Sequence, residues 1–327
     1  MNKTKTIYLA FLATLSVACT SDGSPEASPS AEAPDAIVLT ASMGQGGATR
    51  GGQAIQATAF DEGELISVEV TPTGGTMQSS VYRAGAATEG NGFKNPLTVY
   101  SRAITWPANN GTVGIRAYYP STVGSTTVGS STESCTVQAD QSQDDDYKLS
   151  DLMYAEAVNG QAKVSSVPLT FHHALSKIVV NLVAGNAGVG ASDLAACEVA
   201  VKACRTTAIT NGVATSVTNA VSADDYGWIP IGTGAALAAV IVPQTIAGTT
   251  ASPVPFLRVN WNSKKLYLRL SASKTFEASK QYTYNLKVSG SGLTVESSTV
   301  TGWTAQSPSY VSTVLQSEKK KIIHQNN

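Results

Sequence analysis

The sequence contains few charged side chains and no long apolar segment that could cross a membrane as a helix. Charged residues make up 14% of the chain, against about 25% in an average globular protein, and the net charge is −1. This balance argues against binding to nucleic acid or to an anionic membrane surface. No run of the sequence approaches the roughly 18 apolar residues of a transmembrane helix, so we expect no membrane-spanning segment.

Residues suited to catalysis or metal binding are also scarce. The only histidines are His172, His173 and His324, and neither a G-x-S-x-G elbow nor a strand–glycine loop–helix unit for phosphate binding occurs. His172 and His173 are adjacent on a predicted strand, so they point to opposite faces and cannot chelate one ion. The acidic run Asp144–Asp146 lacks the spacing of a calcium loop, which favours a solvated surface insertion. We predict no enzyme, no metal and no cofactor, although paired carboxylates for glycoside hydrolysis remain an open alternative.

The cysteines do not predict a disulfide framework. They are Cys19, Cys135, Cys197 and Cys204, and three remain if Cys19 is used elsewhere. Cys197 and Cys204 would face opposite ways on one straight strand, so a bridge between them needs a turn. We expect these three cysteines to be small buried or half-exposed side chains.

The N-terminus is predicted to be a signal peptide of residues 1–18. Its apolar run of about a dozen residues follows two lysines and is too short to span a bilayer. The end of this run, LSVAC at Leu15–Cys19, resembles a bacterial lipobox, although Ser16 stands where leucine is usual. This interpretation makes Cys19 the acylated first residue of a lipoprotein; an ordinary signal peptide with a chance cysteine is the alternative. Residues 19–35, rich in Ser, Pro, Ala and Glu, are then a tether.

The remaining pattern predicts an all-β fold. Short apolar runs alternate with polar residues, as in Val113–Tyr119, and turns rich in Gly, Ser and Thr separate them. The spacing favours two tandem β-sandwich domains of about seven strands each, at residues 36–166 and 167–304. A tail of residues 305–327 follows. The only plausible helical turn is Ser192–Ala196, with Ser192 or Asp193 as its cap.

The segment Pro168–Leu182 changes its apolar register. Buried positions are odd up to Phe171 and even from Ile178 onward. A strand cannot change faces without an extra residue, so we expect a bulge or sharp bend within His173–Lys177. The segment is either one strand hydrogen-bonded in two contexts or two strands meeting at a corner. In both cases it marks the seam between the two domains.

A first strand precedes a loop that a protease can reach. The strand's alternating apolar residues are Ile37, Leu39, Ala41 and Met43. The glycine-rich segment Gly44–Gln53 follows, with Arg50 at its centre, and such a loop is a favourable substrate for a trypsin-like protease that cuts before Gly51. On sequence alone, a solvated loop arginine is the simpler interpretation of Arg50.

Four motifs in order resemble the fimbrillin family of Bacteroides-type bacteria. PLTFHHALSKIVVNL at Pro168–Leu182, preceded by DLMYA at Asp151–Ala155, is the first of them. The others are AAVIVPQT at Ala238–Thr245, KTFEASKQYTYNLKVSGSGLTV at Lys274–Val295 and TVTGWT at Thr299–Thr304. Each motif alone is ordinary β sequence, whereas the four together are specific and span most of residues 36–304.

The resemblance implies that the two domains are transthyretin-like sandwiches. It also implies that the protein is a fimbrial (pilus) subunit, similar to the type V pilins. The precursor would be anchored to the outer membrane only through the lipid on Cys19. A trypsin-like maturation protease would cut after Arg50 and remove the anchor together with the first strand. A strand from a neighbouring subunit of the same type would then fill the groove, and the resulting homopolymer would mediate adhesion at the cell surface. Within the tail, Ser309–Leu315 is the candidate donor strand.

The competing interpretation is a surface lipoprotein that binds glycan or protein and never polymerises. In that case Arg50 is only a loop residue. Trp106, Trp228 and Trp261 then become candidate platforms for sugar rings.

Overall fold

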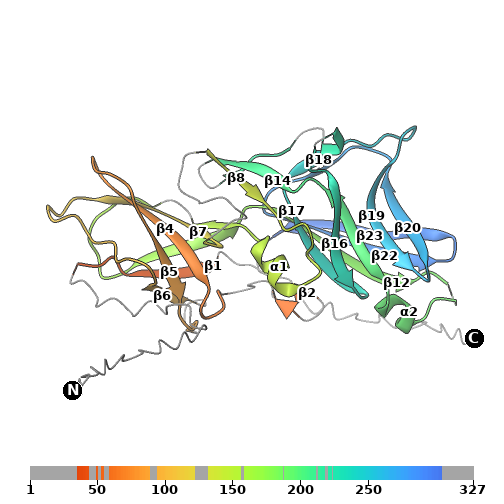
Figure 1. The fold of residues 1–327 in the computed structure, drawn as a ribbon, viewed down its shortest axis with the longest axis horizontal. Coiled ribbons are helices and arrows are strands. Elements are labelled where there is room, and N and C mark those ends of the chain that lie inside the picture. Colours follow the sequence, from red (N-terminus) through yellow and green to blue (C-terminus); the bar gives the residue numbers. More distant parts are fainter. Residues whose placement is uncertain are drawn as a thin grey trace, which may run out of the picture.

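The computed structural model describes residues 35–43, 49–50, 53–54, 59–88, 94–121, 132–155, 158–186, 188–210, 213–217, 220–222 and 224–303. These residues form an all-β molecule, as predicted, with two short α-helices among them (Figure 1). The elements of the first half are β1 (Leu39–Met43), β2 (Thr49–Arg50), β3 (Gln53–Ala54), β4 (Leu65–Pro72), β5 (Gln78–Ala84), β6 (Asn95–Val99), β7 (Val113–Tyr119), β8 (Thr132–Thr136), α1 (Asp144–Leu149), β9 (Met153–Ala155), β10 (Val158–Gln161) and β11 (Val167–His173). The second half contains β12 (Ser176–Ala184), α2 (Ala191–Ala195), β13 (Glu198–Ala203), β14 (Thr206–Thr210), β15 (Val213–Ala214), a 3-10 turn (Ala220–Ser222), β16 (Gly227–Thr233), β17 (Ala236–Ile241), β18 (Gln244–Ile246), β19 (Val254–Trp261), β20 (Lys264–Leu270), β21 (Lys274–Phe276), β22 (Lys280–Ser289) and β23 (Gly292–Gly302).

Eight strands of the first half form one sheet that closes on itself. Their order in this eight-stranded sheet is β10-β7-β4-β5-β6-β1-β11-β9, and β9 also pairs with β7. For residues 36–166 a sandwich of two facing sheets was predicted, whereas these strands belong to a single sheet. Strand twist accumulates from one strand to the next, and in this half it brings the first and last strands of the ring within hydrogen-bonding distance.

The interior of the closed sheet is filled by the alternate residues of its strands. Phe60, which lies before β4, packs its ring against Tyr119 and Phe171 at centroid distances of 5.2 and 5.0 Å. Tyr82 and Trp106 are buried in the same core. The period-2 pattern of the sequence thus reports correctly which side chains point inward.

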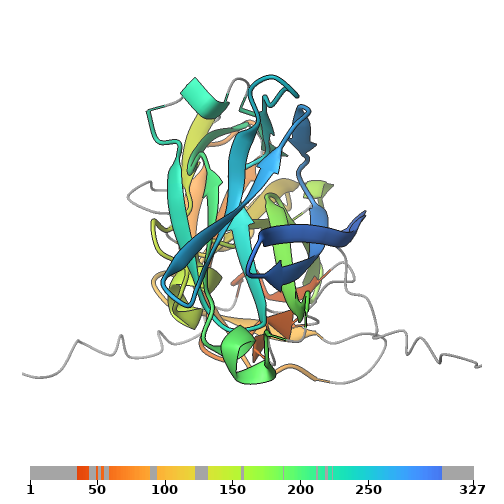
Figure 2. The ribbon, with the colours of Figure 1, turned by 90° about the vertical axis from the view of Figure 1, so that its right-hand side faces the viewer.

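The second half contains two four-stranded sheets around a second hydrophobic core. Their strand orders are β17-β12-β22-β23 and β16-β13-β19-β20. Figure 2 shows this half end-on, with the blue strands of both sheets facing the viewer. Val199 and Val201 of β13 and Ile178 and Val180 of β12 contribute to the core between the sheets.

The register change in Pro168–Leu182 is a corner between two strands. β11 pairs with β1 and β9 in the closed sheet, whereas β12 pairs with β17 and β22 in the second half. Ala174 and Leu175 connect the two strands and are both buried. Of the two alternatives offered by the sequence, two strands meeting at a corner is confirmed.

The chain divides between the two cores differently from the predicted boundary at residue 167. β11 belongs to the closed sheet, although the prediction assigned it to the second domain. Conversely, Cys135, Tyr147 and Leu152 lie in the second core, where β8 pairs with β14 and α1 buries Tyr147. Strand pairing between distant segments decides this division, and local pattern does not report it.

The helices are short. α1 begins at Asp144 and buries Tyr147, so the acidic run is the first turn of a helix and not part of a loop. Asp144 and Asp145 are exposed, as predicted for a solvated surface segment. α2 corresponds to the predicted turn at Ser192–Ala196, and the Asp193 carboxylate accepts a hydrogen bond from the Gly190 N–H at 2.7 Å. Within the described residues, neither the length nor the apolarity of any helix suffices to cross a bilayer.

Candidate functional site

β1 occupies the interior of the closed sheet between β6 and β11. It runs parallel to β11, with Leu39 opposite Val167 and Met43 opposite Phe171. It runs antiparallel to β6, with Leu39 opposite Leu97 and Ala41 opposite Asn95. Loss of β1 would therefore open the closed sheet and leave two unpaired strand edges facing each other across a slot. We call this space, bounded by β6 and β11, the β1 slot.

The inward side chains of β1 fill the core of the first half. Leu39 and Ala41 are fully buried, and Ile37 and Met43 are 1% and 9% exposed. Burial of a large aliphatic side chain contributes about 1.5–3 kcal/mol, so three such side chains amount to a substantial share of the stability of a small domain. The backbone hydrogen bonds continue before the start of β1, where the Ile37 N–H donates to Ile104 O at 2.8 Å.

The outer face of β1 is in contact with solvent. Val38 is 48% exposed, and Thr40 and Ser42 are half-buried. The hydroxyl of Ser42 donates to Leu169 O at 3.3 Å. Among the described residues, this bond is the one side-chain hydrogen bond that the outer face of β1 makes.

The chain after β1 leads to the predicted cleavage point. Thr49–Arg50 and Gln53–Ala54 form a small antiparallel ladder, with Arg50 opposite Gln53. The bond predicted to be cut thus follows directly on Arg50, the last residue of β2. Gly51 and the segment 44–48 lie outside the described residues, as do Cys19, the signal peptide and the tail 305–327.

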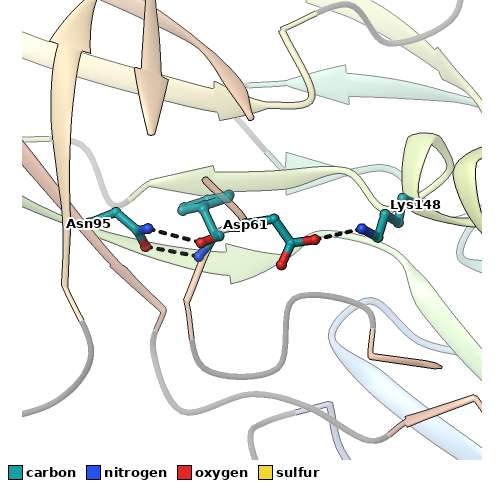
Figure 3. A network of polar contacts seen from close by, with 4 residues as sticks. Asp61, Asn95 and Lys148 are labelled. Carbon is teal, nitrogen blue, oxygen red and sulfur yellow. Dashed lines mark hydrogen bonds and ion pairs between the residues drawn. The ribbon is translucent and has the colours of Figure 1, made fainter. Parts of the chain in front are cut away.

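The chain that follows the hairpin is held to the sheet independently of β1 (Figure 3). The side chain of Asn95 on β6 accepts a hydrogen bond from Phe60 N–H at 2.9 Å and donates to Phe60 O at 2.9 Å and Gly85 O at 2.7 Å. Asp61 forms an ion pair with Lys148 of α1 at 2.5 Å. These contacts would keep the new N-terminal segment in place after a cut at Arg50, while β1 has no such tie to it within the described chain.

Replacement of Asn95 by alanine is expected to destabilise the protein by about 2–4 kcal/mol, because two buried backbone groups of Phe60 and one of Gly85 lose their partner. The free energy of unfolding in urea measures the effect. Asn285→Ala is the control, because the Asn285 side chain bonds only to Asn181 and Ser297 on a half-exposed sheet face and should cost under about 1 kcal/mol. Equal losses in the two variants would contradict the anchoring role of Asn95.

A second polar group of residues lies buried at the corner between β11 and β12. His173 Nδ1 is 2.8 Å from Asp151 Oδ1, and the His173 ring stacks on Trp303 at a centroid distance of 4.0 Å. The Lys177 side chain is fully buried, with its Nζ 5.8 Å from the centre of the Trp303 ring. We call Asp151, His173, Lys177 and Trp303 the corner cluster.

The electrostatics of the corner cluster are dominated by burial. Burial lowers the pKa of Lys177 to about 8, and the negative charge of Asp151 opposes part of that shift. No side chain of the cluster is more than 3% exposed, so a substrate cannot reach it. The cluster is therefore structural, and within the described chain His173 is bonded through Nδ1 while its Nε2 is buried without a hydrogen-bond partner.

The sequence profile of the fimbrillin-like family matches residues 49–303. The chain belongs to the fimbrillin-like family. It is similar to the structure of a protein from Bacteroides uniformis ATCC 8492 with a proposed role in cell adhesion, with 21% identity, a TM-score of 0.61, and coverage of 82% of this chain and 98% of that one. A second such protein, from Bacteroides ovatus ATCC 8483, has 17% identity, a TM-score of 0.58, and coverage of 84% and 100%. At these identities the likeness concerns the fold alone, and no curated protein matches the chain.

The motifs that identify the fimbrillin-like chain converge on the corner cluster. Asp151 begins the DLMYA motif, and His173 and Lys177 belong to the corner segment. Ser279 of the third motif donates from its hydroxyl to His173 O at 2.5 Å, and Trp303 comes from the last motif. The motifs thus mark the junction of the two cores, and the motif Pro168–Leu182 also supplies most of β11, one wall of the β1 slot.

Several predicted site residues are placed elsewhere than the sequence suggested. Trp106 is 5% exposed and buried in the first core, so its assignment as a sugar platform is wrong. Trp228 and Trp261 are half-buried on the second half. Cys135, Cys197 and Cys204 are free and buried, as expected. No group of His, Cys, Asp or Glu suited to a metal ion exists among the described residues.

Sequence reasoning missed Asn95 and Lys177. Asn95 has no local signal, because its three partners lie 10 or 35 residues away in the chain. Lys177 had one: it is a charged residue inside an apolar strand, and such a residue is buried only when its charge is compensated.

Proposed function

We propose that this chain is a fimbrial subunit, made as a lipoprotein precursor and assembled by exchange of β1 for a strand of a neighbouring subunit. The observation that carries the proposal is the position of β1, which is completely buried on its inner face yet flanked by two strands that it alone separates. Membership in the fimbrillin-like family supports the same role. The likeness to proteins with a proposed role in cell adhesion agrees with adhesion as the function of the filament.

In this scheme the lipid on Cys19 anchors the precursor to the outer membrane, and a trypsin-like protease cuts between Arg50 and Gly51. The Asn95 and Lys148 contacts retain the chain beyond the cut, and β1 leaves with the anchor. A neighbour's strand then restores the ladder on both edges of the β1 slot. Repetition of a head-to-tail contact that does not close on itself yields a filament at the cell surface.

The shape of the β1 slot restricts which sequences can serve as the donor strand. It must supply apolar side chains at alternate positions, with a small residue where Ala41 packs. Val311, Thr313 and Leu315 of the tail repeat the large–small–large order of Leu39, Ala41 and Met43. The segment Ser309–Leu315, which lies outside the described residues, is therefore our candidate donor, in the direction that runs parallel to β11.

Arg50→Ala is expected to block assembly, because the uncut chain keeps its own β1 in the slot. Electron microscopy of cells should show no filaments of this subunit, and the protein should remain lipid-anchored. N-terminal sequencing of wild-type protein shed from cells should begin at Gly51. Arg102→Ala, at an exposed arginine far from the hairpin, is the control and should assemble normally. Normal filaments from Arg50→Ala would refute the scheme.

The alternative function, a lipoprotein that binds glycan without polymerising, is favoured by the half-exposed Trp228. It predicts shed or extracted protein that begins with a blocked, acylated Cys19 and never at Gly51. The same N-terminal sequencing therefore separates the two candidates.

A further inference from the structure

The outer face of the sheet β16-β13-β19-β20 carries a group of cations held over aromatic rings. Lys202 Nζ lies 4.7 Å from the ring centre of Tyr226 and 6.0 Å from that of Trp228. The guanidinium of Arg258 lies 4.8 Å from the same Trp228 ring. Two positive charges from neighbouring strands therefore share one indole. We call Lys202, Tyr226, Trp228 and Arg258 the cationic face.

Strand register explains why these side chains meet. Lys202 is directly opposite Trp228, and Ala200 of the same strand is opposite Arg258. These residues point away from the core, since Val199 and Val201 between them point into it. The small side chain of Ala200 leaves room for Arg258 to extend across β13 to the indole.

Neither cation has an anionic partner. Lys202 and Arg258 form no ion pair with any described residue; the ion pairs of the described chain lie elsewhere, at Lys148, Lys163, His173 and Lys287. The sheet face adds Arg269, whose guanidinium lies 5.5 Å from the Tyr267 ring. In a chain of net charge −1, this is a local excess of positioned positive charge.

A hollow of about 200 Å³ adjoins Arg258 on the same face. Its polar lining comes from Ser142, Glu198, Thr233, Arg258 and Asn260. Asn260 Nδ2 donates to Glu198 Oε2 at 2.9 Å, whereas Asn260 Oδ1 is buried without a hydrogen-bond partner. The hollow therefore offers acceptors, a hydroxyl-bearing rim and one guanidinium, which together suit a ligand with several hydroxyl groups and one negative charge.

We propose that the cationic face and its hollow bind an acidic glycan, with a sugar carboxylate on Arg258 and Lys202 and the hydroxyls of one ring in the hollow. Planar guanidinium groups bind carboxylates through two parallel hydrogen bonds, and the ring stack holds Arg258 ready for that geometry. The hollow is smaller than the roughly 300–1,000 Å³ of a drug-sized pocket, which fits a single sugar ring. An acidic peptide fits less well, because peptides usually add to a strand edge or an apolar groove and this site is an open sheet face.

Binding by one copy should be weak, and repetition of the face along a filament would raise the avidity. The gain in avidity depends on the proposed polymerisation, whereas binding at the site itself does not depend on it. The test is therefore made on the monomeric precursor, where failure of strand exchange cannot affect the result.

The experiment compares three probes by titration calorimetry: a hyaluronan hexasaccharide, the same hexasaccharide with its carboxyls reduced to alcohols, and hexaglutamate. We expect binding of the first that weakens with added salt, and at least about tenfold weaker binding of the second. Arg258→Gln should weaken binding of the charged hexasaccharide about tenfold or more, and Lys202→Gln should weaken it less, because lysine acts as a point charge.

The matched control is Arg83→Gln. Arg83 also lies over an aromatic ring, that of Tyr100 at 4.7 Å, but in the first half of the chain, so its loss should leave binding unchanged. Thermal unfolding confirms that each variant folds. The proposal is overturned if the charged hexasaccharide does not bind, if the reduced form or hexaglutamate binds equally well, or if Arg258→Gln has no larger effect than Arg83→Gln.

Discussion

A chain that begins at Gly51 is expected to lose most of the stability of its first half and to regain it when a peptide spanning Ala36–Met43 is added. Without β1, the side chains of Ile37, Leu39 and Met43 are missing from the core, at a cost of about 1.5–3 kcal/mol each. The edges of β6 and β11 also lose their ladder partners. The total approaches the whole stability of a typical domain, about 5–15 kcal/mol.

Trp106 provides the measurement, because it is the tryptophan of the first core and the described tryptophans of the second half lie apart from it. Urea unfolding followed by its fluorescence should show a large loss of stability in the truncated chain. The added peptide should restore the transition to higher urea, and a peptide with Leu39→Asp should not. If the truncated chain unfolds at the same urea concentration as the intact one, β1 contributes nothing and the slot is not a site of exchange.

The same assay tests the donor. A peptide of Ser309–Leu315 should restore stability in the same way, and Val311→Asp should abolish its effect, because an aspartate would occupy the position that Leu39 fills. Failure of this peptide alone would exclude the tail as the donor while the result with the Ala36–Met43 peptide still decides whether the slot accepts strands.

Asp151→Ala is expected to destabilise the protein by about 3–5 kcal/mol, because it leaves the buried Lys177 charge without its counter-charge. His173 also loses its 2.8 Å hydrogen bond. The free energy of unfolding measured in urea at pH 7 tests this. Asp224→Ala, at an exposed aspartate, is the control and should change stability by no more than about 0.5 kcal/mol. A small loss in Asp151→Ala would mean that the corner cluster does not depend on its carboxylate.

Lys177 should also give the protein a characteristic pH dependence. Burial lowers the pKa of Lys177 to about 8, from 10.5 in the unfolded chain. Between these two values the lysine of the unfolded chain retains a proton that the folded chain has lost, so the contribution of Lys177 to the free energy of unfolding rises with pH, by up to about 3 kcal/mol. Below pH 8 both states are protonated, and the full cost of burying the charge is present.

Lys177→Met isolates this effect. Burial raises the pKa of Cys135 and Cys204 to about 12, so above pH 9 these two thiols lower stability as pH increases and can outweigh the lysine in the wild type. The groups that face Lys177, namely Asp151 and His173, are unchanged in the variant. The difference in stability, wild type minus Lys177→Met, should therefore become more positive between pH 8 and 10.5. A difference that stays constant over this range would show that Lys177 remains charged in the folded protein.

Local sequence pattern correctly predicted features that belong to a single strand or to one strand end. The alternation in Ile37–Met43 correctly predicted which face of β1 is buried. The register change correctly predicted the corner between β11 and β12, since a strand can exchange its faces only at an irregularity. Short alternating apolar runs separated by turns rich in Gly, Ser and Thr indicated the all-β fold.

The errors arose wherever the outcome depended on pairing between distant segments. The acidic residues Asp144–Asp146 looked like a loop, but Tyr147 anchors them to the second core as a helix. Trp106 was a candidate platform for sugar rings, yet the closed sheet buries it. The burial of Tyr147 and Trp106 depends on which distant segments pack against them, and sequence periodicity contains no information about such contacts.

By itself, the sequence determined the all-β class, the buried face of the first strand, the corner at the centre of the chain and the family to which the chain belongs, because periodicity, composition and motif order are properties of contiguous residues. Only the tertiary structure decided that β1 separates β6 from β11, that Asn95 holds the chain beyond Arg50, and that unpaired cations gather over Trp228. Each of these depends on a register between strands far apart in the chain, and the free energy that selects a register comes from contacts that form only when the whole sheet is assembled.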